Sequence, residues 1–170
     1  CDTMNWQEVR EPIGMLKDEV VACPDEVWHE NLWPTDPHPP EISQFWYVVY
    51  HTLFWLDLYL TGSEEGFVPP SPFMLIEQYW IGPIPEHAYT KTELLDYLEG
   101  CRGRCQSTIE GLTDEAFGRR CELPWGEVSF AELLLYSMRH VQEHAAQLNL
   151  TLGQNGYEAS DWVAWAGKKD

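Results

Sequence analysis

The chain has 170 residues, of which 44% are hydrophobic and 14% aromatic, and nine of them are tryptophan. This composition is typical of one globular domain with a sizeable core, and it excludes a disordered chain. The formal net charge of −18, from 10 basic and 28 acidic residues, argues against DNA, RNA and anionic membrane surfaces as partners, because these require a basic protein surface.

The first expected helix covers residues 5–22. Apolar residues recur there at steps of three and four, as an amphipathic helix requires, namely at Trp6, Val9, Ile13, Leu16 and Val20. Pro12 and Gly14 interrupt the pattern and predict a kink or a late start. A linker rich in proline follows at residues 29–40.

The second expected helix covers residues 41–60, with Pro40 suited to its start. Its middle is apolar nearly all round, which predicts a central helix, and it carries His51. Residues 61–89 are rich in glycine and proline and too long for a simple turn. We interpret them as a crossover that returns along the whole bundle, with a short helix near 73–79 as an option.

The third expected helix covers residues 91–111 and opens on a capping box at Thr90 and Glu93. A second linker follows at residues 113–128, and no convincing strand pattern is found there or elsewhere.

The fourth expected helix covers residues 130–152, between a capping box at Ser129 and a stop at Gly153. The tail from 155 to 170 is interpreted as a turn and a short helix carrying Trp162 and Trp165.

These elements predict an all-α fold, a four-helix bundle with one long crossover between the second and third helices. We expect a single domain over residues 1–170, with its core at about 5–152 and a tail at 153–170.

Cysteine usage indicates a reducing compartment. The five cysteines are an odd number, and a chain of this size needs no disulfides, so reduced thiols and a cytoplasmic location are expected. Cys101 and Cys105 are four residues apart on one helical face, which differs from the CxxC spacing of zinc ribbons. No apolar run reaches the ~20 residues of a transmembrane helix.

Three histidines form the candidate functional site. His140 and His144 lie four residues apart on the fourth helix, so their side chains are ~40° apart and one turn apart and can reach one point. A third mid-helix histidine, His51, would complete three neutral nitrogen ligands and leave one position open. Zinc, nickel or iron would accept this set, and the metal would activate a water or a thiol.

Other polar and aromatic residues have weaker claims. Glu143 lies between the two helical histidines, as a general base or as a solvated surface carboxylate. Tyr47 and Trp55 flank His51 by one turn on each side, either packing in the core or lining a substrate pocket. The remaining histidines are expected in solvated linkers, at positions 29, 38 and 87.

The sequence resembles the DinB-like (YfiT-like) superfamily of metal-dependent enzymes. The resemblance rests on His51 in the second helix, a long crossover, and the segment Arg139 to Leu148 with its His-x3-His pattern. Ala146 stands where many relatives have glycine. The resemblance implies an up-down-down-up bundle with His51, His140 and His144 around zinc or nickel. It also implies a low-molecular-weight thiol as cosubstrate, as in relatives that act as thiol-dependent transferases or isomerases.

We therefore expect a metal-dependent enzyme acting on a small molecule, either a thiol S-transferase or a hydrolase. One alternative is a non-catalytic, stress-associated bundle that keeps the metal site. Another is a small-molecule binder that uses the aromatic pocket without a metal. Exposed aromatic residues in the crossover and the tail favour a homodimer.

Overall fold

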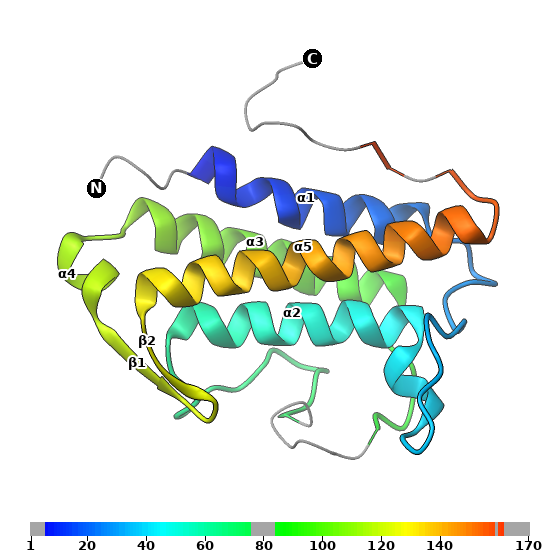
Figure 1. Ribbon diagram of the computed structural model, residues 1–170, viewed down its shortest axis with the longest axis horizontal. Helices are drawn as coiled ribbons and strands as arrows, with labels where there is room; N and C mark the ends of the chain where they lie inside the picture. Colours follow the sequence, from blue (N-terminus) through cyan, green and yellow to red (C-terminus); the bar gives the residue numbers. More distant parts are fainter. Residues whose placement is uncertain (1–5, 76–83, 159, 162–170) are drawn as a thin grey trace.

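The structure is a computed structural model that describes residues 6–75, 84–158 and 160–161. Its four long helices are α1 (Trp6–Ala22), α2 (Phe45–Thr61), α3 (Lys91–Glu110) and α5 (Phe130–Gln154). Its short elements are the 3-10 turn η1 (Pro40–Ser43), α4 (Asp114–Gly118), β1 (Arg120–Leu123) and β2 (Gly126–Ser129). The all-α prediction is confirmed, with one small hairpin added (Figure 1).

The long helices pack side by side, and α2 is the central one. It contacts both α3 and α5, and α1 contacts the same two helices. Nearly every side chain of α2 is buried, as its apolar sequence predicts.

The start of α2 lies near the start of α3, and the end of α2 lies near the segment that follows α3. Near the starts of both helices, the rings of Trp46 and Tyr89 lie 5.9 Å apart. At the other end, Arg119 Nη2 donates to the carbonyl oxygen of Thr61 at 2.9 Å. The short helix expected near 73–79 extends into residues that the structure does not describe.

The start of the second helix differs from the predicted 41–60. Pro40–Ser43 form the turn η1, Gln44 is extended with φ −70° and ψ 149°, and the α-helix begins one residue later. Gln44 forms an antiparallel bridge with Asn31, whose Nδ2 donates to the Ser43 hydroxyl at 2.6 Å. This pairing with the proline-rich segment holds Gln44 in an extended conformation. The helical pattern of apolar residues cannot predict such a pairing.

The prediction of residues 113–128 as a linker without strands is wrong. The segment contains α4 and a hairpin, in which Leu123 lies opposite Gly126 across the two-residue turn Pro124–Trp125. In β1 exposed and buried side chains alternate, with Cys121 and Leu123 facing inward. Strands of four residues offer only two inward positions each, too few for periodicity to reveal.

Two helix breakers do not break their helices. Pro12 lies within a continuous α1, where the flanking Ile13 and the nearby Leu16 are fully buried against the core. Packing of this apolar face outweighs the loss of one backbone hydrogen bond. Gly153 was expected as a stop, yet α5 continues through it to Gln154, since glycine costs only ~1 kcal/mol within a helix.

The two capping boxes are confirmed. Glu93 Oε2 accepts from the backbone N–H of Thr90 at 2.8 Å, and the Thr90 hydroxyl accepts from the N–H of Glu93 at 3.3 Å. Ser129 and Glu132 repeat the arrangement at the start of α5. These caps fix the first turn of the helix that carries two of the candidate ligands.

An ion pair between the buried Asp57 and the exposed Arg104 ties α2 to α3 away from the histidines. Asp57 is nearly inaccessible; its carboxylate accepts from Arg104 Nε at 2.6 Å and from the Tyr97 hydroxyl at 3.1 Å. These partners account for a charged residue in the core, in keeping with its omission from the predicted site.

The expected tail helix with Trp162 and Trp165 lies outside the described residues. Across the part of the chain that the structure does describe, no helix has the length and apolar character needed to cross a membrane.

Candidate metal centre

The three predicted histidines meet between α2 and α5. Nε2 of His140 lies 3.2 Å from Nε2 of His51 and 3.1 Å from Nε2 of His144. One nitrogen from each ring falls within 4.8 Å of the other two, and all three side chains are half-buried. The site therefore combines a local pair, one turn apart on α5, with a ligand 89 residues earlier in the chain.

Gln147 sets the protonation of His144. Its side-chain oxygen lies 2.7 Å from His144 Nδ1. Because a carbonyl oxygen only accepts, Nδ1 must carry the proton, which leaves the lone pair of Nε2 directed at the other two imidazoles. An outer hydrogen bond of this kind also fixes the ring orientation of a metal-binding histidine.

His140 lies at the centre of the three rings and stays neutral. Burial, followed by the proximity of His51 and His144, lowers the pKa of His140 to about 3. Its Nδ1 is buried with no hydrogen-bond partner among the described residues, so the ring interacts through nitrogen only at Nε2.

This donor set fits a divalent metal ion. Metal–nitrogen bonds of ~2.0–2.1 Å bring neighbouring ligand nitrogens to roughly 3–3.4 Å, which matches the two observed spacings. With the proton on Nδ1, a neutral His144 presents a lone pair at Nε2, and a single proton on His140 Nε2 could bridge to only one of its two neighbours. Convergent imidazole lone pairs are stabilised by a cation, and zinc or nickel suits such ligands.

Aromatic rings wall the site on one side. Each ring in this wall contacts the next, in the order His51, Trp55, Tyr59, Tyr136 and His140, with centroid separations of 6.5, 5.4, 5.5 and 6.5 Å. The ring centroids of His51 and His140 lie 5.1 Å apart, so the first and last rings of the wall also contact each other. The wall arises because residues four apart on each helix stack along its axis.

Tyr59 is the buried member of the aromatic wall. Burial first, and then the neighbouring Tyr136 hydroxyl, raise the pKa of the Tyr59 phenol, so this group keeps its proton. Trp125, at the turn of the hairpin, stacks on Tyr136 with centroids 5.1 Å apart. The hairpin therefore reaches the three histidines through Tyr136.

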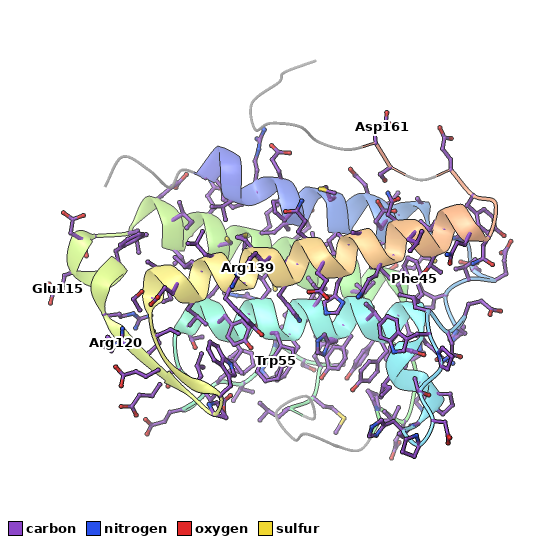
Figure 2. The ribbon with its side chains drawn as sticks, in the orientation of Figure 1. Phe45, Trp55, Glu115, Arg120, Arg139 and Asp161 are labelled. Carbon is purple, nitrogen blue, oxygen red and sulfur yellow. The ribbon has the colours of Figure 1, made fainter. Side chains whose placement is uncertain are left out.

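The other predicted site residues are placed as follows. Trp55 is half-buried within the aromatic wall (Figure 2). Tyr47 is buried and packs edge-on against Trp46 and Tyr50. Glu143 is exposed on α5.

The three linker histidines, at positions 29, 38 and 87, are exposed as predicted.

Three contributors to the site were not assigned from the sequence. Gln147 lies three residues after His144 and Tyr136 four residues before His140, so helical spacing could have indicated both. Trp125 left no such signal, because only the fold of the hairpin brings it to Tyr136.

None of the described cysteines is a reactive thiol. Cys23, Cys101, Cys105 and Cys121 are buried and free. Burial raises the pKa of Cys23 and of Cys105 to about 12, and it also raises the pKa of the other two. A nucleophilic cysteine needs a lowered pKa and access to solvent, so these thiols have structural roles.

Comparison with known proteins agrees with this geometry. The DinB superfamily matches residues 8–148, a range that includes all three histidines. A solved structure of a DinB-like protein, YjoA from Bacillus subtilis, has the same fold, with a TM-score of 0.62 at 15% identity. The alignment covers 92% of this chain and 95% of that one. No curated protein matches the sequence. Because the family match spans most of its length, this chain belongs to the DinB superfamily.

Proposed function

We propose that this protein is a metal-dependent enzyme in which His51, His140 and His144 hold one divalent ion, zinc or nickel. The observation that carries the proposal is the convergence of three imidazole nitrogens from two helices, 3.1 and 3.2 Å apart. Three protein ligands leave a coordination position open, as catalytic sites require. When bound, such an ion lowers the pKa of a water or a thiol toward neutrality.

The surrounding residues prepare the site for that ion. Gln147 holds His144 in the tautomer whose Nε2 lone pair faces inward. Burial keeps His140 neutral, so protons compete weakly for its nitrogen. Trp55 and Tyr136 wall the site and would exclude water from a bound small-molecule substrate.

The reactive thiol, if the reaction is an S-transfer, comes from a low-molecular-weight cosubstrate. The buried Cys101 and Cys105, with their raised pKa values, are unsuited to the role. Hydrolysis is the second candidate reaction, and it needs only a water at the open position.

Glu143 belongs to the proposal as a candidate base, with its exposed position on α5 as the alternative explanation. Tyr47 and Trp55 belong to it as pocket residues flanking His51.

The proposal includes the up-down-down-up arrangement of the four long helices. Figure 1 supports it, because the sequence colours run in one direction along α1 and α5 and in the other along α2 and α3. This arrangement explains why the chain needs a crossover between α2 and α3.

Metal binding to purified, chelator-treated protein tests the function. Zinc or nickel in excess should raise the melting temperature of the wild-type protein, since a ligand at 100 times its Kd stabilises by ~2.7 kcal/mol. His144→Ala should abolish the shift. His29→Ala is the matched control, because His29 is exposed in a loop. An equal shift in all three proteins would reject the site.

Turnover then separates the enzyme from a non-catalytic metal binder. Metal-loaded protein is screened with thiol acceptors and with esters, beside His144→Ala. Activity that disappears with the histidine supports the enzyme. Metal binding without turnover in either screen supports the non-catalytic alternative.

A further inference from the structure

A second feature lies on the outer face of α5, one helical turn from the histidines. The hairpin borders an open hollow of about 490 Å³ on this face. We call it the hairpin hollow; its lining residues are Trp125, Val128, Glu132, Leu135, Tyr136 and Arg139. Its volume suits a small organic molecule.

One side chain of the hairpin hollow contacts the histidine cluster. Tyr136 lines the hollow and stacks on His140, with the two ring planes only 8° apart. Trp125 stacks on Tyr136 at 30°. Three nearly parallel rings therefore lead from the hairpin turn to the central histidine.

Part of the apolar lining is exposed to solvent. Trp125 is 48% exposed and Leu135 is 55% exposed, although both are large and apolar. The tight turn between Leu123 and Gly126 holds Trp125 in place. A preformed aromatic surface of this kind is typical of a ligand site, because stacking a flat ring on it needs little ordering.

The hairpin hollow is lined by one cationic and one anionic side chain, Arg139 and Glu132. The Arg139 guanidinium lies 5.9 Å from the Tyr136 ring centroid and has no carboxylate partner among the described residues. Glu132, the only acidic residue of the lining, accepts from the N–H and hydroxyl of Ser129 at 2.8 and 2.7 Å. These hydrogen bonds hold the Glu132 carboxylate at the helix cap. Arg139 is exposed on α5 (Figure 2), where an anionic ligand can meet it.

We propose that the hairpin hollow binds the body of the substrate, a planar organic acid. Its ring stacks on Trp125 and Tyr136, and its carboxylate pairs with the fork of N–H donors on Arg139. Its reactive end extends past Tyr136 toward His140. The proposal rests on the proposed function, because it makes the hollow one arm of the site centred on the histidines.

Titration of chelator-treated, full-length protein with 2-naphthoate tests the carboxylate contact. Arg139→Gln should weaken binding by about tenfold, the usual effect of losing one hydrogen-bonded charge pair. Arg102→Gln, at an exposed position on α3, is the matched control and should bind like the wild type. Naphthalene-2-methanol, which has the same rings without the charge, should bind wild type and Arg139→Gln equally.

The stacking contact has its own control. Trp125→Ala should weaken both probes by at least about fivefold. Trp33→Ala, at another half-exposed tryptophan, should change neither. The proposal would be overturned if 2-naphthoate did not bind, or if neither Arg139→Gln nor Trp125→Ala changed its affinity.

His144→Ala distinguishes the hollow from the histidines. It should leave 2-naphthoate binding by the chelator-treated protein within about twofold. If His144→Ala loses 2-naphthoate binding while Arg139→Gln binds it as the wild type does, the carboxylate lies at the histidines and the proposal is overturned. Zinc-induced thermal shifts of the same samples test the metal site separately. A failure of the metal site can therefore be told apart from a failure of the hairpin hollow.

Discussion

Nε2 of His51 on α2 lies 3.2 Å from Nε2 of His140 on α5, although the two residues are 89 positions apart. Two imidazole nitrogens this close repel each other through their lone pairs unless a proton or a metal ion lies between them. The contact also joins α2, whose side chains are nearly all buried, to α5, which has one buried and one exposed face.

Removing one ligand should abolish tight metal binding. His51→Ala and His144→Ala each leave two nitrogens, and zinc affinity should fall by more than the ~10–100-fold that loss of a supporting residue causes. Competition with a chromophoric chelator measures the affinity. His38→Ala, in an exposed loop, should bind as the wild type does. Full affinity in His51→Ala would mean that α2 contributes no ligand.

Gln147 should tune affinity without providing a ligand. Gln147→Leu removes the acceptor at His144 Nδ1, and zinc affinity should fall by ~10–100-fold while the bound stoichiometry stays the same. Gln147→Glu restores an acceptor and should recover most of the affinity. Gln106→Leu, on α3 and hydrogen-bonded to Glu110, controls for loss of a helical glutamine. An unchanged affinity in Gln147→Leu would contradict the assigned tautomer.

The metal-free protein should lose stability in acid through His140. Its folded-state pKa of about 3 is depressed from the ordinary 6.5, so the unfolded chain binds the proton first. The stabilising contribution is complete above pH 6.5 and is lost as the pH falls toward 3. The slope reaches at most ~1.4 kcal/mol per pH unit for one proton.

Urea unfolding at several pH values checks this. His140→Gln carries no such proton, so its free energy of unfolding should fall less steeply than that of the wild type below pH 6.5. Parallel curves for the two proteins would show that His140 titrates normally in the fold.

The buried thiols should react slowly with thiol reagents in the native protein. In a Cys1→Ser variant, a thiol reagent such as 5,5′-dithiobis(2-nitrobenzoate) should react slowly under native conditions and completely in denaturant. Burial and raised pKa values protect all four remaining thiols, at positions 23, 101, 105 and 121. Rapid modification of Cys101 or Cys105 together with loss of turnover would instead make the chain's own thiol the reactive one.

Much of the fold follows from local physics. Apolar periodicity and the capping boxes at Thr90 and Ser129 locate α3 and α5 to within two residues, because these helices are amphipathic and their end signals are local. The hairpin and the late start of α2 depend on pairings with distant segments, such as Asn31 with Gln44, which no local pattern encodes.

The site divides in the same way. The pair His140 and His144 is readable from its spacing alone, whereas its meeting with His51 is a long-range contact that the family resemblance implied. Gln147 was within reach of helical spacing. The approach of Trp125 to Tyr136 was not, because it depends on the hairpin.

Anomalous scattering from crystals of zinc- or nickel-loaded protein tests the central claim most directly. The account predicts one strong peak at the metal's absorption edge, ~2.0–2.1 Å from Nε2 of His51, His140 and His144. The absence of a peak there, with all three rings ordered, would contradict it, as would a peak held by other residues.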